Sequence, residues 1–275
     1  NREIMSWPID IPFCIVDFET TGMFPQFGDR VVEYAYIVAK NGQIIDRGTE
    51  LVNPDRPMKR GASLANGITD EMLRGKPSFV EVGNDLLKAI EGRVFVAHNA
   101  KFDLGFLAYE CQKVGMEQPR FMALDSLNLS RSLWKDPDNY KLTNLARIVG
   151  HTWSGDAHRA MADVEALFSV LDFLFRKYPD KLSTIDKLFS LGGILQTTIE
   201  MPSEDVEISE LAKTLQKNIN NPIMIRYNSK SSGTKNSIIT PLEVRIVNGD
   251  EFVEAYCEIG GKNKTFKLSR IETID

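Results

Sequence analysis

The sequence has few cysteines, no long apolar run and no excess of basic residues, and each absence excludes a class of protein. Three of the 275 residues are cysteines, at positions 14, 111 and 257, without the spacing of a zinc site or a disulfide framework. We therefore expect reduced, buried cysteines and a cytoplasmic protein. No apolar run approaches the length of a membrane span, and the first ten residues lack the basic and apolar regions of a signal peptide. We expect no membrane association.

The charge balance is slightly acidic, with 33 basic and 38 acidic residues and a net charge of −5. Any nucleic-acid binding must therefore depend on a local site rather than on overall charge. The composition, 43% hydrophobic and 26% charged, is that of a globular protein and contains no low-complexity tract. The length exceeds that of one typical domain, so we expect one large and one small domain.

The strongest chemical signal is a strand that ends in two carboxylates. Residues 13–16 (FCIV) predict a buried strand. Asp17 and Glu19 continue it two residues apart, so their side chains point to the same face. Two close like charges are costly unless a cation lies between them. Residues 20–22 (TTG) predict a turn with hydroxyl and backbone N–H groups. A divalent-metal site beside a phosphate-binding turn is our hypothesis; carboxylates at an ordinary strand end are the alternative for this stretch alone.

The rest of the first 180 residues predicts an α/β domain. Residues 30–40 and 43–52 predict two strands joined in a hairpin at Asn41-Gly42. Strands and helices then alternate, which favours an α/β fold with polar groups at the strand ends. The strands are expected at residues 94–97 and 122–126, and the helices at 69–73, 78–90, 104–114, 127–133 and 142–149, with a last long helix ending near 177.

Two further carboxylates and two histidines lie at predicted element boundaries. Asp103 lies near the start of the helix at 104–114, where it could simply cap the helix. Asp163 lies in the first turns of the last long helix, where the helix dipole alone favours an acidic residue. His158 precedes Asp163 by five residues and could converge with it from an entry loop. His98 is typical of a structural histidine, and we assign it no chemistry.

Together, four carboxylates and a histidine are the side chains that two-metal phosphodiester hydrolysis requires. Two divalent cations about 3.5–4 Å apart can stabilise both the attacking and the leaving oxygen. Carboxylate ligands favour Mg²⁺ or Mn²⁺. A histidine with a pKa near neutrality can take a proton from the attacking water.

Three ordered motifs resemble those of a known family. Residues 17–22 (DFETTG), 98–103 (HNAKFD) and 158–163 (HRAMAD) resemble the motifs of the DEDD superfamily of 3′–5′ exonucleases, in the histidine-containing branch that includes the epsilon proofreading subunit of bacterial DNA polymerase. The resemblance covers residues 12–176. It implies an RNase H-like mixed-sheet fold and the release of nucleoside 5′-monophosphates from nucleic-acid 3′ ends.

The resemblance also implies a role for each matching residue. Two cations, Mg²⁺ or Mn²⁺, would be held by four carboxylates, and a histidine would be the general base; these are Asp17, Glu19, Asp103, Asp163 and His158. The terminal nucleotide would be contacted by the turn, and the second motif would be supported by an asparagine; these are Thr20, Thr21, Gly22, Met23 and Asn99.

The sequence does not decide whether the substrate is DNA or RNA. We expect single-stranded DNA, or nicked and frayed 3′ ends, as the substrate, with a 3′–5′ exoribonuclease as the alternative, because contacts to a 2′-hydroxyl cannot be placed from sequence. An alternative of another class is a nucleic-acid sensor without catalysis, against which the intact carboxylates argue. Proofreading, repair, RNA turnover and defence all remain open as pathways.

The C-terminal third predicts a separate small domain. We expect an exonuclease domain over residues 1–180, a linker with short helical pieces over 181–205, and a β domain over 206–275. The last of these combines one helix at 208–218 with several strands and predicts a small β-barrel or meander. The strands are expected at 223–227, 237–247, 251–257 and 264–268, with turns at Asn248-Gly249 and Gly260-Gly261.

This β domain resembles the WYL module. The resemblance rests on residues 225–227 (IRY), 240–242 (TPL) and 265–271 (TFKLSRI), while Glu254 departs from the apolar residue that is usual at its position. It implies a small Sm-like or SH3-like β-barrel and the binding of a nucleic acid or a nucleotide-like ligand. The candidates for phosphate contact and base stacking are Arg226, Tyr227, Arg245 and Arg270, for which ordinary surface charge is the alternative.

Overall fold

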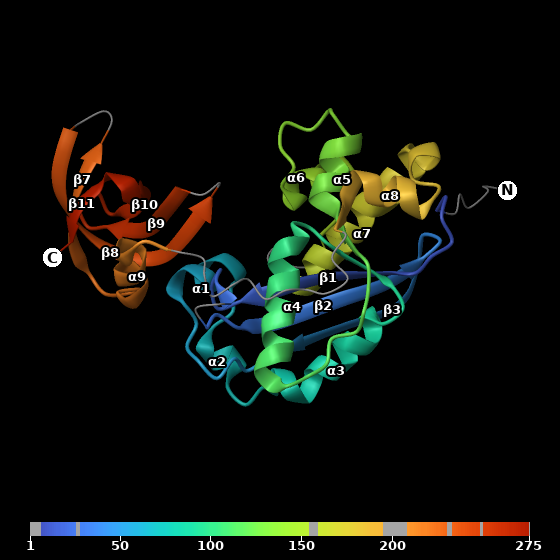
Figure 1. Cartoon of the computed structure of the whole chain (residues 1–275), viewed down its shortest axis with the longest axis horizontal. Coiled ribbons are helices and arrows are strands. Elements are labelled where there is room, and N and C mark those ends of the chain that lie inside the picture. The colour runs from blue at the N-terminus through green and yellow to red at the C-terminus, as the bar shows by residue number, and fades with distance from the viewer. Residues whose placement is uncertain are drawn as a thin grey trace. The chain divides into compact units, whose positions relative to one another are not determined.

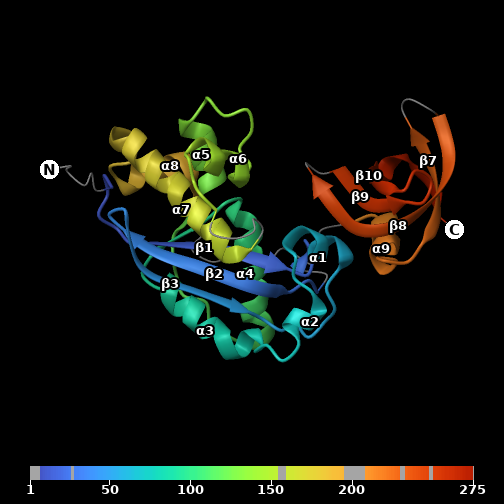
Figure 2. The same cartoon turned by 180° about the vertical axis from the view of Figure 1, so that it is seen from behind.

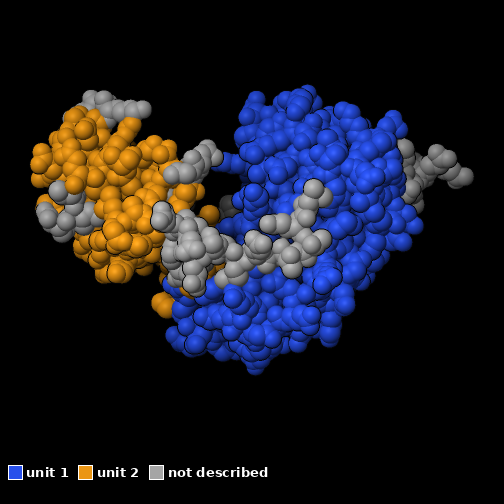
Figure 3. Space-filling model, viewed as in Figure 1, with its two compact units in different colours: residues 1–20, 30–56, 66–201 blue, residues 21–29, 57–65, 202–275 orange. Residues whose placement is uncertain are grey.

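The computed structural model describes residues 7–25, 28–153, 159–194, 208–229, 233–247 and 250–274. The chain divides into two compact units, shown in different colours in Figure 3. The larger unit contains residues 1–20, 30–56 and 66–201, and the smaller contains 21–29, 57–65 and 202–275. The smaller unit thus combines the C-terminal part with two short segments from the N-terminal half. The domain boundaries drawn at 180 and 205 stay predictions.

The larger unit is built on a six-stranded mixed sheet in the order β3-β2-β1-β4-β5-β6 (Figure 1). β1, β2 and β3 are antiparallel neighbours, β4 and β5 run parallel to β1, and β6 is antiparallel to β5. This confirms the mixed sheet expected from the sequence. The strands are β1 Phe13–Thr20, β2 Val31–Lys40, β3 Gln43–Leu51, β4 Val94–Ala97, β5 Ala123–Asp125 and β6 Gly193–Ile194.

The predicted hairpin between β2 and β3 is confirmed. Asn41 and Gly42 both adopt left-handed backbone conformations, with φ of 54° and 76°. A two-residue hairpin turn of this type needs positive φ at both central positions, which asparagine and glycine tolerate best.

Helices cover both faces of the sheet (Figures 1 and 2). Phe13 and Ile15 of β1 belong to the core formed with α5, α6, α7 and α8, whereas Cys14 and Val16 belong to the core formed with α3 and α4. Since successive strand residues point to opposite faces, Asp17 and Glu19 share the face that α7 covers. The helices of this unit are α2 Asp70–Leu73, α3 Phe79–Ile90, α4 Ala100–Val114, α5 Ser126–Leu133, α6 Leu142–Ile148, α7 Ala160–Lys177, the 3₁₀ turn Pro179–Lys181, and α8 Ile185–Gly192. Helix α1, Arg60–Asn66, belongs to the smaller unit except for its last residue.

Two sequence expectations are corrected in this unit. The helix expected at 104–114 starts earlier, because Asn99 leaves β4 in a left-handed conformation and α4 begins at the next residue. Asp103 therefore lies inside the first turn and does not cap the helix. The glycines at 192 and 193 lie in the segment expected to be a linker, but they end α8 and start β6, and Gly193 pairs with Leu124.

The smaller unit contains α9 and a five-stranded antiparallel sheet in the order β10-β9-β8-β7-β11. Its core includes Leu215 of α9 together with Ile225 and Val253 of the sheet. The predicted antiparallel sheet is confirmed; in the described pairings β10 and β11 are its edges, and closure into a barrel stays a prediction. The elements are α9 Glu210–Lys217, β7 Ile223–Ser229, β8 Gly233–Val247, β9 Asp250–Cys257, β10 Lys262–Lys267, the 3₁₀ turn Leu268–Arg270, and β11 Ile271–Ile274.

The turns and strand bounds of this sheet agree in part with those predicted from the sequence. Gly260 and Gly261 connect β9 to β10 with φ of 118° and 58°, as the glycine pair predicts. The turn expected at Asn248-Gly249 lies outside the described residues. β8 begins at Gly233, four residues before the strand that was expected from 237.

Two compositional expectations can be compared with the structure. All three cysteines are free and buried, as predicted. Within the described ranges, no helix combines the length and the apolar character that crossing a membrane requires.

Candidate active site

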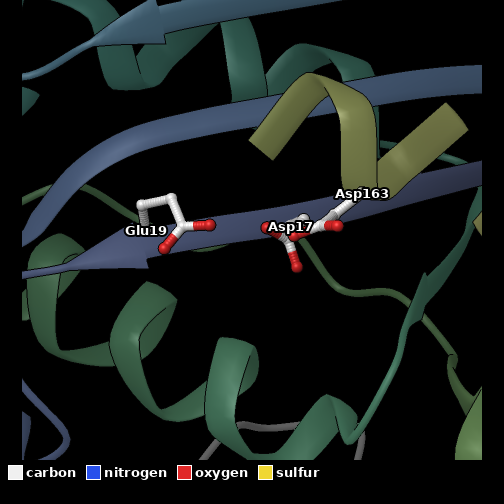
Figure 4. Close-up of side chains that lie close together, drawn as sticks. All are labelled: Asp17, Glu19 and Asp163. Atoms are coloured by element: carbon white, nitrogen blue, oxygen red, sulfur yellow. The ribbon is translucent and has the colours of Figure 1, made fainter. Parts of the chain in front are cut away.

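Three carboxylates meet where the end of β1 approaches the first turn of α7. Asp17 and Glu19 come from β1 and Asp163 comes from α7, and one oxygen from each lies within 4.8 Å of the others (Figure 4). Asp163 is buried, and the other two are half-buried. The prediction that Asp17 and Glu19 share one face is confirmed, and α7 adds a third carboxylate to that face.

Asp103 approaches the same strand from the opposite layer of the unit. It lies in the first turn of α4, is buried, and accepts a hydrogen bond from the Phe18 backbone N–H at 3.3 Å. This hydrogen bond ties its carboxylate to the edge of β1, between Asp17 and Glu19 in the chain. Asp103 is outside the close group of three but contributes its charge to it, being the neighbour that most raises the pKa of Asp17.

Burial and mutual repulsion disfavour the charged forms of these carboxylates. Burial raises the pKa of Asp17 well above its usual range, and the charges of Asp103 and Glu19 add to the effect. Burial, followed by the charge of Asp163, raises the pKa of Glu19 to about 8. Burial likewise raises the pKa of Asp103. A bound divalent cation favours the charged forms, and an all-carboxylate donor set suits hard cations such as Mg²⁺ and Mn²⁺. The residues present therefore fit a divalent-metal site.

Asn66 is a neighbour of this site to which the sequence assigned no role. Its side-chain amide donates to the Thr20 carbonyl at 3.4 Å and its oxygen accepts from the Ile68 N–H at 3.0 Å. A hydrogen bond from Asn66 also opposes the rise in the pKa of Glu19. Asn66 thus connects the end of β1 to the segment that follows α1. An asparagine followed by glycine is an ordinary turn signal, so the sequence could not have indicated this contact.

In the smaller unit, a buried carboxylate organises the predicted substrate turn. Asp29 accepts hydrogen bonds from the Thr21 hydroxyl at 3.0 Å and from the Phe24 N–H at 3.1 Å. Its charge is compensated by Lys59, whose Nζ lies 2.7 Å from Asp29 Oδ2. The Lys59 N–H also donates to the Thr21 carbonyl at 3.4 Å. Sequence reasoning missed Asp29 and Lys59, which are 30 residues apart and share no motif.

The same carboxylate explains the glycine of the turn. A Cβ atom at Gly22 would lie 2.4 Å from Asp29 Oδ2, so any side chain would displace the carboxylate. Met23, the next residue, leaves 41% of its side chain exposed, as a contact with a nucleotide base requires. The roles of Thr20, Thr21, Gly22 and Met23 in nucleotide contact stay predictions.

The second motif begins with two residues whose contacts are structural. The Asn99 N–H donates to Asp125 Oδ1 at 3.1 Å, which connects the end of β4 to the end of β5. His98 Nε2 lies 2.8 Å from the Tyr140 carbonyl, and Nδ1 lies 2.8 Å from the Ser126 hydroxyl. Because a carbonyl only accepts, Nε2 carries the proton and Nδ1 accepts from Ser126. His98 is a hydrogen-bonded structural residue, as expected.

This arrangement predicts a pH dependence of stability. Burial lowers the pKa of His98, so the folded protein holds it neutral while the unfolded chain protonates near pH 6.5. The unfolded state then binds more protons, and the free energy of unfolding should fall as the pH drops below about 6.5. Urea unfolding at pH 7.5 and 5.5 should show this loss, and it should be smaller in His98→Gln. An equal loss in both proteins would contradict the assignment.

The third motif is described only in part. His158, the predicted general base, lies outside the described residues. Arg159, the residue after it, and Asp163 are described, and the Asp163 N–H donates to the Arg159 carbonyl at 3.1 Å. This hydrogen bond closes the first turn of α7.

The C-terminal ligand candidates do not share one surface. Arg226 and Tyr227 are successive residues of β7 and point to opposite faces. Tyr227 packs edge-on against Phe266 of the core, with ring centroids 5.0 Å apart. Arg226 is 57% exposed and lies 3.1 Å from a carboxylate oxygen of Glu272. Arg270 is half-buried in the 3₁₀ turn, and the side chain of Arg245 lies outside the described residues. All four stay predictions as ligand residues.

Comparison with known proteins agrees with this geometry. A family model for exonucleases (RNase T) matches residues 14–171, and a WYL-domain model matches residues 218–275. The 3′-5′ exonuclease DinG of Bacillus subtilis is 34% identical over 170 residues, which are 62% of this chain and 18% of DinG. The PolC-type DNA polymerase III of Halalkalibacterium halodurans is 36% identical over 163 residues, 58% of this chain and 11% of PolC. The chain therefore spans less than a fifth of the length of these relatives.

Two solved structures share the fold. Exonuclease X in complex with 5′-overhanging duplex DNA superposes with a TM-score of 0.52 and 24% identity, covering 65% of this chain and 98% of that one. Escherichia coli Exonuclease I in its zinc-bound complex with single-stranded DNA gives a TM-score of 0.58 and 17% identity, covering 97% of this chain and 64% of that one. At these identities the superpositions show an RNase H-like exonuclease fold.

Proposed function

Because the chain belongs to the RNase T exonuclease family and carries a WYL domain, we propose that it is a 3′–5′ exonuclease that hydrolyses single-stranded DNA, or nicked and frayed 3′ ends, to nucleoside 5′-monophosphates. The observation that carries the proposal is the group of carboxylates on Asp17, Glu19 and Asp163, with Asp103 held against the same strand. All four carboxylates of the family pattern are therefore present at the end of β1, which disfavours a sensor without catalysis.

The chemistry divides between a bound metal and the chain's own side chains. Asp17, Glu19, Asp103 and Asp163 would hold two divalent cations, Mg²⁺ or Mn²⁺, which stabilise the charge that develops on the phosphate oxygens. Phe18 N–H orients Asp103, and the first turn of α7 orients Asp163. His158, which resembles the histidine of the family's third motif, would take the proton from the attacking water.

Support for DNA as the substrate comes from the relatives. The name of DinG, a 3′-5′ exonuclease, specifies no substrate, whereas PolC is named a DNA polymerase and both solved structures contain DNA. The turn of Thr21, Gly22 and Met23 would bind the terminal nucleotide, because its conformation is fixed by Asp29 and Met23 is exposed. RNA is the alternative substrate, and a direct comparison of the cleavage rates of DNA and RNA decides between the two.

We assign a sensing or strand-holding role to the C-terminal WYL domain, which would bind nucleic acid or a nucleotide-like ligand. Arg226 is the best-placed candidate, because it is exposed on β7. Binding of a fluorescent oligonucleotide in EDTA should weaken in Arg226→Ala, with a shallower salt dependence because one phosphate contact is lost. The exposed Lys235→Ala is the matched control on β8. Equal affinity of Arg226→Ala and the native protein would remove Arg226 from the ligand site.

The function is tested with 3′-labelled and 5′-labelled single-stranded DNA and RNA, in Mg²⁺, Mn²⁺ or EDTA. Mononucleotides should be released from the 3′ end of DNA in either metal, and EDTA should lower the rate by at least ~10²-fold because the carboxylates then lack their cations. Faster cleavage of RNA would identify an exoribonuclease. Binding without hydrolysis in every metal would contradict the proposal in favour of a sensor.

A further inference from the structure

A fifth buried carboxylate lies beside the proposed metal site. Glu33 belongs to β2, directly opposite Glu19 in the antiparallel register, and is only 4% exposed. It accepts two hydrogen bonds from the Arg159 guanidinium, from Nη2 at 2.7 Å and from Nε at 3.1 Å. It also accepts the Ala160 backbone N–H at 3.0 Å. The carboxylate thus bonds two successive residues that are 126 and 127 positions away in the sequence.

Those two residues begin the helix that carries Asp163. Ala160 is the first residue of α7, and Arg159 is its N-cap residue. The first N–H groups of a helix have no partner within the helix, so Glu33 satisfies one of them with a charged acceptor. The Arg159 carbonyl in turn accepts the Asp163 N–H at 3.1 Å. Glu33 of β2 is therefore hydrogen-bonded to Arg159 and Ala160, and Arg159 is in turn hydrogen-bonded to the backbone of Asp163.

We propose that Glu33 is a positioning residue for hydrolysis, which through Arg159 and the Ala160 N–H holds the first turn of α7 so that Asp163 faces Asp17 and Glu19. The inference rests on the proposed function and extends it to a residue outside the four carboxylates of the family pattern. Glu33 would act on the rate by setting the position of one metal ligand.

The placement of a carboxylate at this point has an electrostatic disadvantage. Burial and neighbouring carboxylates, Glu33 among them, raise the pKa values of Asp17 and Glu19. A neutral serine or asparagine could cap a helix without adding negative charge. The planar guanidinium of Arg159 compensates the charge and, by bonding both oxygens, restricts the orientation of the pair. Orientation is the property that a neutral cap would not supply.

The chain contains a matched control for this arrangement. Glu110 of α4 accepts Arg30 Nε at 2.8 Å, Arg30 Nη2 at 2.7 Å and the Val31 backbone N–H at 3.0 Å. It is fully buried and makes the same three kinds of contact as Glu33. Glu110→Gln and Glu33→Gln therefore disrupt ion pairs of the same contact pattern, in which Arg30 is 9% exposed and Arg159 is 37% exposed. Only the Glu33 pair bonds to the helix turn that carries Asp163.

The test compares Glu33→Gln and Glu110→Gln in the full-length protein. Glu33→Gln should lower kcat ~10–100-fold at saturating Mg²⁺ with little change in KM for DNA, and should weaken Mn²⁺ binding in calorimetry about tenfold or more. Glu110→Gln should lose stability in urea unfolding but keep kcat and Mn²⁺ affinity within about twofold. Equal losses of kcat and Mn²⁺ affinity in the two variants would overturn the positioning role, as would native values in Glu33→Gln.

A second variant and a second readout keep the inference separate from the proposed function. Arg159→Lys retains the charge without the bidentate geometry and should show a smaller loss of Mn²⁺ affinity in the same direction. Amide hydrogen exchange at Asp163 should be faster in Glu33→Gln and unchanged in Glu110→Gln. If the native protein binds Mn²⁺ but cleaves no nucleic acid, the proposed function fails, while Mn²⁺ affinity and exchange still decide the role of Glu33. Native amide exchange at Asp163 and native Mn²⁺ affinity in both Arg159→Lys and Glu33→Gln would refute the positioning role of Glu33.

Discussion

Asp17→Asn should lower kcat on single-stranded DNA by at least ~10²-fold at saturating Mg²⁺, because it removes one charged ligand from the group formed with Glu19 and Asp163. Asparagine has nearly the shape of aspartate, so the effect on rate would come from charge and not from packing. The measurement is release of 3′-labelled nucleotide under single-turnover conditions. A rate within about threefold of native would refute the metal-ligand assignment.

The same variant has a second expected result that distinguishes loss of a ligand from loss of the fold. Burial and the charges of Asp103 and Glu19 raise the pKa of Asp17, which means that the folded protein disfavours its ionised form. Asp17→Asn should therefore raise the melting temperature in EDTA at neutral pH and remove part of the stabilisation by Mn²⁺. Asp46→Asn, an exposed position on β3, is the control and should change neither rate nor melting temperature. A lower melting temperature for Asp17→Asn in EDTA would indicate a structural role.

Lys59→Met should lower the free energy of unfolding by about 3–5 kcal/mol, because it leaves the Asp29 carboxylate buried without its cation. Methionine retains most of the lysine stem, so packing changes little. Asp29 also holds the Thr21 hydroxyl and the Phe24 N–H, so the turn that would bind the terminal nucleotide should loosen and KM for DNA should rise. Urea unfolding and steady-state kinetics measure the two effects.

The matched control is a lysine in an exposed ion pair. Lys88 lies 3.9 Å from Asp85 on α3, and both side chains are 75% exposed. An exposed pair of this kind contributes about 0–1 kcal/mol, so Lys88→Met should be close to native in stability and in KM. Equal stability of Lys59→Met and Lys88→Met would show that Asp29 does not depend on Lys59.

The sequence predicted the strand that carries Asp17 and Glu19, because the pattern that indicates it lies within a few consecutive residues. Alternation along β1 places Asp17 and Glu19 on the face of Phe13 and Ile15, and this follows from the period of a strand alone. The hairpin at Asn41-Gly42 likewise depends on two adjacent residues that tolerate positive φ. The role of Asp103 could be predicted from its motif, but its bond to the Phe18 N–H could not, since it joins residues 85 positions apart.

Which charged residues outside the three motifs become buried was decided by tertiary structure. Glu33 in a strand, Lys59 before a helix and Asp29 in a loop look like ordinary charged residues in sequence, because nothing in their neighbourhoods indicates burial. They become buried only when distant segments pack together, and each then requires a partner of opposite charge, as in Glu33–Arg159 and Asp29–Lys59. The proposed ligands and the order of their motifs could thus be predicted from the sequence itself. The two ion pairs were decided by the fold, because the cost of burying a charge depends on neighbours that only folding supplies.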